Sequence, residues 1–220
     1  MERLIETDLE KLTTETLTAM RLAQTAVDKA MAAVFDRDRA PAVAEAVIAA
    51  DPAIDAIESD MDAEILRLLA LHQPVAGDLR YILGCMRIVG DVERIGDQAV
   101  GIAKRGLLLS ERQPMPPSPS LKELTAITGE FLARTIRCFT ERNAEAARDI
   151  RRDSIAIQDR NEAILKDMAA VMLEEARPVE PAVQVCFIAH GLKRICDQCA
   201  NIAESIIFIK EGACARHSRV

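Results

Sequence analysis

Apolar residues recur at helical spacing along most of the chain, and the pattern is clearest in two stretches that lie 100 residues apart. Steps of three and four residues separate the apolar positions Cys85, Ile88, Val92, Ile95, Ala99 and Ile102. The same steps recur at Val185, Ile188, Leu192, Ile195, Cys199 and Ile202. This spacing places each set along one stripe of an α-helix, as in coiled coils. The chain has no Asn-Gly or Asp-Gly hairpin turn and no long alternating run, so strands are not expected.

The two stretches are copies of one unit. Residues 88–103 and 188–203 are identical at seven of sixteen positions, far above chance, which indicates a duplication. A proline-rich segment at 113–120 separates the halves, because its four prolines cannot continue a helix. We therefore predict a first repeat at 1–113, a second repeat at 119–212 and a short tail at 213–220.

Each half is predicted to contain three helices. Breaks near prolines and the final Gly212 give approximate ranges of 2–36, 40–72, 75–112, 120–144, 147–176 and 179–212. Asp51-Pro52 lies inside the second range, where it would either kink that helix or restart it. Short connections favour antiparallel neighbours, so the expected fold class is all-α, with two tandem three-helix bundles related by the internal repeat.

Composition and charge narrow the functional classes. The net charge is −7 and no basic block is present, which disfavours direct nucleic-acid binding. The N-terminus is charged from Glu2 to Glu10, so no signal peptide is expected. The most apolar stretch, 181–192, is shorter than the roughly 20 residues of a membrane span. Six cysteines without an export signal indicate reduced thiols, and we expect a cytoplasmic protein.

Carboxylates at helical spacing are the candidate metal ligands. Glu93 and Asp97 share one helix face, roughly opposite the apolar stripe. Glu58 and Asp62, with Asp55, form an acidic ridge on the second helix, and the two sets would converge if these helices pack side by side. Grouped carboxylates suit Mg²⁺, Mn²⁺, Ca²⁺ or iron. The alternative is a solvated face whose acids pair with neighbouring Lys and Arg.

The second copy carries a different set on the equivalent face. Asp197 and Asn201 occupy it, while Lys193 replaces the acid. Arg94 and Arg194 precede the repeated aspartates by three residues. Either arginine would steer a phosphate or a partner's carboxylate, or form an (i, i+3) ion pair with the aspartate that follows it.

Enzyme signatures are missing, so no catalytic residue is predicted. The chain contains no P-loop, no H-E-x-x-H and no G-x-S-x-G. Cys196 and Cys199 form a C-x-x-C without the βαβ context of a redox motif, and Cys199 falls on the apolar stripe. His72 is expected to end a helix. A carboxylate-ligated metalloenzyme such as a phosphatase, and a metal-free helical scaffold, are the two competing interpretations.

Four segments together resemble the PhoU family over nearly the whole chain. They are QPVAGDLR at 73–80, DVERIGD at 91–97, LKRICDQCANIAE at 192–204, and the acidic pattern at 54–62. The resemblance implies tandem three-helix bundles and frequently a homodimer. It also implies a negative regulator of phosphate uptake that links PstB, the ATPase subunit of a phosphate ABC transporter, to the sensor histidine kinase PhoR. Contact with the membrane would come only through such partners.

The resemblance also implies surface metal clusters on E(D)-x-x-x-D motifs, with Mg, Mn, Fe or Zn as the ion. Glu58-x-x-x-Asp62 and Glu93-x-x-x-Asp97 match this motif, and Asp197 with Asn201 is its counterpart in the second copy. Lys193 departs from the pattern, and we expect it to pair with Asp197. Gly101 stands where the family has Asn, whereas Asn201 is retained.

Overall fold

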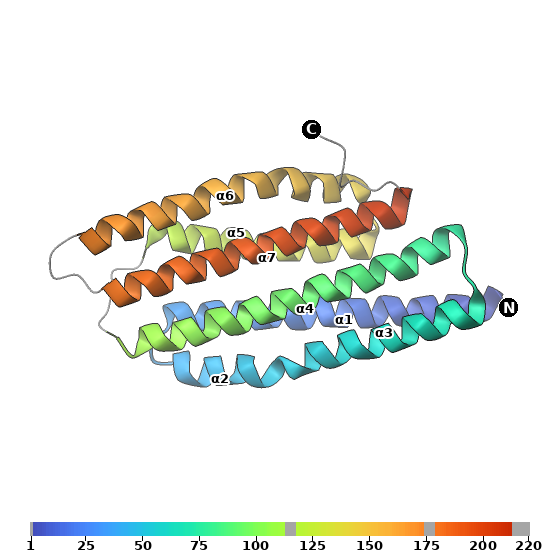
Figure 1. The fold of residues 1–220 in the computed structure, drawn as a ribbon, viewed down its shortest axis with the longest axis horizontal. Coiled ribbons are helices and arrows are strands. Elements are labelled where there is room, and N and C mark those ends of the chain that lie inside the picture. The colour runs from blue at the N-terminus through green and yellow to red at the C-terminus, as the bar shows by residue number, and fades with distance from the viewer. Residues whose placement is uncertain (1, 113–117, 174–178, 213–220) are drawn as a thin grey trace.

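The fold was determined as a computed structural model that describes residues 2–112, 118–173 and 179–212. Within these ranges all regular structure is helical (Figure 1). The helices are α1 (Glu2–Phe35), α2 (Ala40–Ala50), α3 (Pro52–His72), α4 (Ala76–Ser110), α5 (Pro119–Glu141), α6 (Ala144–Leu173) and α7 (Val179–Glu211). The predicted all-α fold of two tandem bundles is confirmed, with α1 to α4 in one bundle and α5 to α7 in the other. The predicted boundary at residue 113 and the tail at 213–220 lie outside the described residues.

The second predicted helix is two helices, so Pro52 restarts the helix rather than kinking it. Asp51 keeps helical dihedral angles (φ −56°, ψ −45°), and its carbonyl accepts a bond from the amide of Ile54 at 2.8 Å. Pro52 has no N–H group, so it cannot continue the hydrogen-bond ladder of α2. It is suited instead to the first turn of α3, where that donor would have no partner.

The repeated helices α4 and α7 lie side by side at the centre and run antiparallel (Figure 1). The guanidinium of Arg105 donates to the side chain of Gln184 at 2.9 Å near one end of the pair. Near the other end, a Cβ added to Gly84 would lie 2.3 Å from a side-chain carbon of Ile209. The two helices therefore approach closely at Gly84, where an added side chain would have to displace that of Ile209.

The predicted apolar stripes are confirmed as the core. All twelve stripe residues of α4 and α7 are buried. Each stripe packs against the other helices of its own bundle, α1, α2 and α3 for α4 and α5 and α6 for α7. The core is therefore two packed bundles joined along α4 and α7.

Polar contacts hold the helix ends in place. Ser118 caps α5, because its hydroxyl accepts a bond from the amide of Leu121 at 3.2 Å. Asn143 similarly accepts from the amide of Ala146 at 3.0 Å at the start of α6. In the turn after α1, the guanidinium of Arg37 donates to the carbonyls of Leu109 and Ser110 at 2.9 and 2.7 Å. Arg37 therefore fixes that turn to the end of α4.

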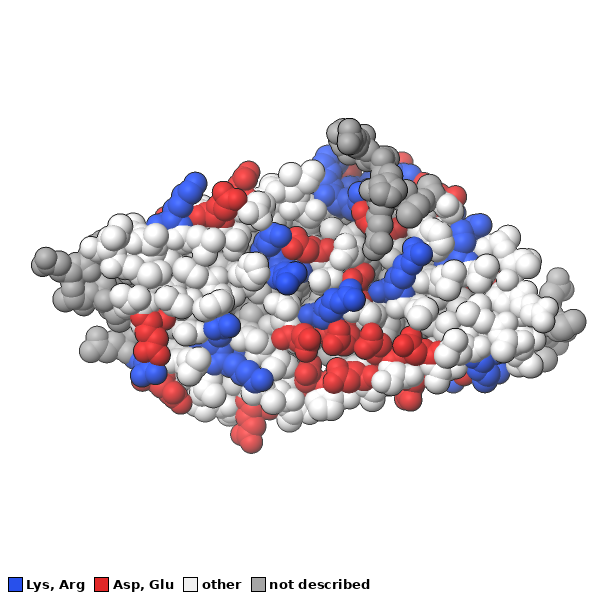
Figure 2. All heavy atoms as spheres, in the orientation of Figure 1, with Lys and Arg blue, Asp and Glu red and all other residues white. Residues whose placement is uncertain are grey.

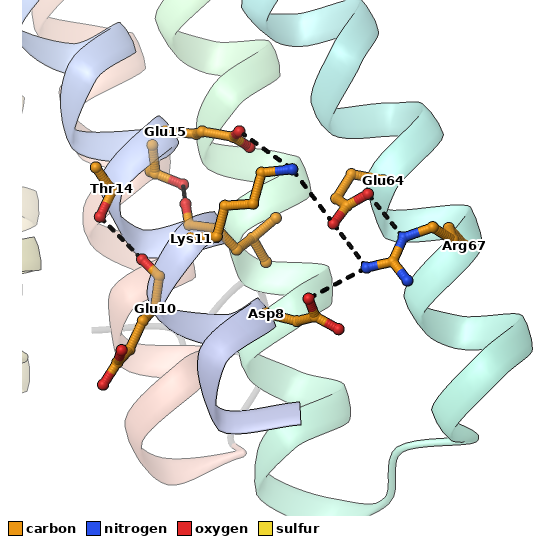
Figure 3. Close-up of polar contacts among 9 residues, drawn as sticks. Asp8, Glu10, Lys11, Thr14, Glu15, Glu64 and Arg67 are labelled. Atoms are coloured by element: carbon orange, nitrogen blue, oxygen red, sulfur yellow. Dashed lines mark hydrogen bonds and ion pairs between the residues drawn. The ribbon is translucent and has the colours of Figure 1, made fainter. Parts of the chain in front are cut away.

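Ion pairs between α1 and α3 close the first bundle at its other end (Figure 3). Arg67 of α3 lies 2.8 Å from the carboxylate of Glu64 and 3.2 Å from that of Asp8 on α1. Lys11 of α1 reaches Glu64 at 3.6 Å. His72 ends α3, as predicted, and its Nε2 also lies 3.0 Å from Asp8. None of the helices in the described residues is long and apolar enough to span a membrane.

Candidate functional site

Six carboxylates on α4, on α3 and on the residue that precedes α3 make the main candidate site. We call them the acidic band: Asp51, Asp55, Glu58, Asp62, Glu93 and Asp97. Figure 2 shows acidic side chains gathered over α3 and α4, with basic side chains next to them. The predicted orientation of Glu93 and Asp97 is confirmed, because Asp97 is exposed and Glu93 is half-buried, away from the apolar stripe.

Glu93 has the most acidic surroundings in the band. Partial burial raises the pKa of its carboxyl, and the nearby carboxylates of Asp97, Glu58 and Asp55 raise it further. Arg94 acts in the opposite direction but does not reverse the shift. The convergence expected from sequence is therefore present for Glu58, Glu93 and Asp97, whose charges interact across the boundary between α3 and α4.

Two further carboxyls of the band, those of Glu58 and Asp51, also have raised pKa values. At Glu58, partial burial and the neighbouring Asp62 raise the pKa, while Arg94 lowers it. At Asp51, between α2 and α3, partial burial raises the pKa and the charges of Asp55 and Asp97 add to the effect. A raised pKa of a carboxyl means that the surroundings disfavour its ionised form. The band therefore carries negative charge that nearby cations do not fully offset.

Two glycines of α4 bring the carboxylates of α3 close to it. A Cβ added to Gly96 would lie 3.3 Å from the side-chain oxygen of Asp51 and 3.0 Å from the Cδ1 of Ile54. A Cβ added to Gly90 would lie 3.4 Å from a carboxylate oxygen of Glu58. Glycine is costly in the interior of a helix, and the close packing of α3 explains why both positions of α4 are glycine.

The donor chemistry of the acidic band suits a hard or borderline cation, since every ligand is a carboxylate oxygen. As the side chains are placed, no three His, Cys, Asp or Glu residues in the described part of the chain are grouped closely enough to hold an ion. Glu58 and Glu93 are only half-buried, so rotation of their long side chains is open to them. The assignment of Glu58, Asp62, Glu93 and Asp97 as ligands stays a prediction.

The equivalent face of the second repeat is arranged differently. The ammonium of Lys193 donates to the carboxylate of Asp197 at 2.7 Å, which is the ion pair expected from sequence. Asn201 donates from its amide to Gln198 at 3.1 Å and to Asp91 of α4 at 3.4 Å. Asp197 is thus occupied by a cationic neighbour, and Asn201 contributes to the contact between the repeats. Their assignment as metal ligands stays a prediction.

Arg94 forms an ion pair, but its partner is not the one expected from sequence. Arg94 pairs with Asp91, three residues before it, at 3.1 Å, and not with Asp97, three residues after it. Side chains on a helix lean toward its N-terminus, which favours the earlier neighbour. Asp91 is buried, so the guanidinium offsets a charge that would otherwise be costly. This leaves Asp97 free of that pair.

The C-x-x-C of α7 is a core feature. Both Cys196 and Cys199 are fully buried, and neither is in a disulfide. The Sγ of Cys196 lies 3.5 Å from the hydroxyl of Thr128 on α5. Burial raises the pKa of Cys196 to about 12, and it also raises the pKa of Cys199. Such thiols remain protonated and unreactive at neutral pH.

Comparison with known proteins agrees with this architecture. The PhoU domain matches residues 16–106 and 121–206, one match in each bundle. A phosphate-specific transport system accessory protein PhoU homolog of Xylella fastidiosa (strain Temecula1) is 32% identical over 205 residues, covering 93% of this chain and 84% of the relative. The homolog of Aquifex aeolicus is 31% identical over 213 residues, covering 97% of this chain and 96% of the relative.

Two crystal structures are similar over nearly the whole chain. PhoU from Pseudomonas aeruginosa superposes with a TM-score of 0.90 at 27% identity, covering 94% of this chain and 99% of that one. The phosphate transport system regulatory protein PhoU from Streptococcus pneumoniae superposes with a TM-score of 0.87 at 27% identity, covering 95% and 98%. With the domain matched in both halves, the chain belongs to the PhoU family.

Proposed function

We propose that this protein is a negative regulator of phosphate uptake and of phosphate-starvation signalling, and that it acts by binding and not by catalysis. Its relatives carry the name of accessory proteins of a phosphate-specific transport system, which supports the pathway. The observation that carries the proposal is the acidic band, in which partial burial and neighbouring carboxylates raise the pKa values of Asp51, Glu58 and Glu93. A cation or a basic partner surface would relieve the repulsion among these carboxylates.

A metal ion is the first ligand that we assign to the acidic band. Glu58, Asp62, Glu93 and Asp97 would supply its oxygen ligands, and Mg, Mn, Fe or Zn are the candidate ions. The ion would convert part of a repulsive surface into a positively charged or neutral one. The second repeat is the weaker candidate, since Lys193 already neutralises Asp197.

Protein partners would bind the resulting surface. We assign the ATPase subunit PstB and the sensor histidine kinase PhoR as those partners, which places the protein in the cytoplasm and at the membrane only through them. Regulation requires a different affinity for two states of a partner, because a ligand that binds both states equally shifts nothing. The rigid double bundle suits this role, since its surface residues are held on long packed helices.

A cation titration tests the metal assignment. Thermal unfolding of chelator-treated protein should shift upward as Mg²⁺, Mn²⁺, Fe²⁺ or Zn²⁺ is added, because binding to the folded state alone stabilises it. A variant combining Glu58→Gln and Asp97→Asn should lose that shift. Glu130→Gln, an exposed acid on α5, is the matched control and should retain it. Equal shifts in all three proteins would place the ion elsewhere and sink the assignment.

A reporter assay tests the regulatory role. In cells lacking the native protein, wild-type protein should repress a phosphate-starvation promoter in high phosphate, and the Glu58→Gln/Asp97→Asn variant should repress it less. Purified PstB and PhoR cytoplasmic domains should bind the wild-type protein and bind the variant more weakly. Full repression by the variant with unchanged binding would show that the acidic band has no regulatory role.

A further inference from the structure

An open hollow of about 370 Å³ lies on the second bundle, between α6 and α7. Its walls are Leu165 of α6 and four residues of α7, which are Val183, Cys186, Phe187 and His190. Three of these five side chains are apolar. The thiol of Cys186 and the imidazole of His190 are therefore the two side-chain groups of the hollow that could bind a metal ion.

Cys186 and His190 are one helical turn apart on the same face of α7. Residues at this spacing have Cβ atoms about 5–6 Å apart. Side chains on a helix lean toward its N-terminus, so the longer imidazole of His190 leans back toward the turn that carries Cys186. The zinc motif H-E-x-x-H places two ligands at the same spacing. With Zn–S and Zn–N bonds of about 2.3 and 2.0–2.1 Å, one ion can join the two side chains.

Neither core packing nor hydrogen bonding accounts for this pair. Of the five cysteines in the described ranges, only Cys186 is not fully buried, and none is in a disulfide. His190 is exposed, and its side chain makes no hydrogen bond or ion pair within residues 2–112, 118–173 and 179–212. The equivalent positions of the first repeat are Met86 and Gly90, so the repeated helix forms without a thiol or an imidazole there.

The wall beside the two groups is held in place by α4. The guanidinium of Arg105 lies 4.0 Å from the ring centroid of Phe187 and also donates to Gln184 at 2.9 Å. Leu165 and Val183 add apolar surface on the other sides of the hollow. Apolar surroundings restrict water and lower the local dielectric, which strengthens the bonds between an ion and its ligands.

We infer that Cys186 and His190 bind a cation that prefers sulfur and nitrogen ligands, Zn²⁺ or Cu⁺, through the Cys186 Sγ and one imidazole nitrogen. Binding displaces the thiol proton to solvent, and no electron is transferred. In the described part of the chain no third His, Cys, Asp or Glu groups with them, so water completes the coordination. With half the ligands of a structural zinc site, the expected affinity is micromolar.

This site differs from the acidic band in both place and chemistry. The band consists of carboxylates in the first repeat, whereas Cys186 and His190 are on α7 of the second. Thiolate and imidazole select soft and borderline ions, and carboxylates select hard ones. The inference therefore does not depend on the proposed regulatory function or on a metal ion at the acidic band.

A Cd²⁺ titration of reduced protein tests the site, because a thiolate bound to Cd²⁺ absorbs in the ultraviolet and carboxylate-bound Cd²⁺ does not. Cys214 lies outside the described residues, so the parent protein carries Cys214→Ser. Its absorption should saturate at about one ion per chain. Cys186→Ser should abolish the absorption, and His190→Gln should weaken binding by about tenfold or more, since one of two protein ligands is lost. Met86→Ser, at the equivalent position of the first repeat, is the matched control and should change neither.

Competition identifies the natural ion. Displacement of Cd²⁺ by Zn²⁺, or by Cu⁺ under anaerobic conditions, would assign that ion to the site, and displacement by neither would overturn the inference. So would a parent protein without thiolate absorption, or a His190→Gln variant that binds Cd²⁺ as tightly as the parent, since Cys186 would then act as an isolated thiol. The helical circular dichroism should match in all variants, because serine is nearly the size of cysteine and His190 is exposed.

Discussion

Replacing Glu93 by Gln removes a partly buried charge that three neighbouring carboxylates repel, and it should make the metal-free protein more stable at neutral pH. Each unfavourable neighbour on a helical surface costs about 0.2–0.5 kcal/mol, and three acids act on Glu93. Arg94 offsets part of this cost and solvent screens the rest, since Glu93 is only half-buried. The expected gain for Glu93→Gln is on the order of 0.5–1 kcal/mol.

The pH dependence of that gain has a definite sign. The pKa of Glu93 is raised in the folded state above its ordinary value of 4.5, so folding disfavours its ionised form. Ionised Glu93 therefore costs stability at neutral pH, and the cost disappears as the pH falls through the folded-state pKa toward 4.5. The difference in the free energy of unfolding between Glu93→Gln and wild type should be largest at neutral pH. It should vanish as the pH falls to the ordinary glutamate pKa of 4.5 and below.

Urea unfolding followed by circular dichroism at neutral pH with chelator measures the gain. High salt should reduce it, because the Coulomb part of the cost is screened whereas the desolvation part is not. Glu130→Gln on α5 is the control and should leave the midpoint unchanged. A Glu93→Gln variant less stable than wild type under these conditions would refute the claim that the acidic band stores uncompensated charge.

Four further outcomes are expected. Gly106→Ala should destabilise the protein by about 1–2 kcal/mol in urea unfolding, because the added Cβ would lie 2.8 Å from the backbone of Ala33. Gly101→Ala in the same helix meets nothing within 4 Å and should instead stabilise it by about 0.5–1 kcal/mol. Lys193→Glu should break the 2.7 Å pair with Asp197 and add cation-binding capacity in calorimetry, whereas Lys193→Gln should not. Cys196 should resist thiol reagents in native protein and react once it is unfolded, as read by mass spectrometry of labelled peptides.

Local rules accounted for the features that depend on spacing alone. The apolar stripes, the duplication and the outward direction of Glu93 follow from helical periodicity, which any single helix carries in its own residues. The helix ends at Phe35, His72 and Glu211 lie within one residue of the predicted ends, since prolines and a terminal glycine interrupt the hydrogen-bond ladder there.

Contacts between distant segments required the folded chain. His72 and Asp8 form a pair although they are 64 residues apart in the sequence, and no sequence motif connects the two positions. Arg94 shows the same limit at short range, because spacing alone permits a partner three residues before it as readily as one three residues after it. The choice of Asp91 depended on side-chain direction and on the burial of that carboxylate.

The contact between the repeats shows how a duplicated unit has become asymmetric. Residues 91 and 191 are equivalent, as are 101 and 201, yet one position of each pair is glycine. Asp91 and Asn201 lie opposite each other on α4 and α7 and share a hydrogen bond of 3.4 Å. At Gly191 a Cβ would lie 3.1 Å from the side chain of Ile102, so the helices are close there and no polar bridge would fit. Equivalent positions of the two repeats thus carry a hydrogen bond between polar side chains in one case and close packing of a glycine against a side chain in the other. The same divergence put Lys193 at the position equivalent to Glu93. The two acids Glu93 and Asp97 of α4 therefore correspond to an ion pair between Lys193 and Asp197 in α7.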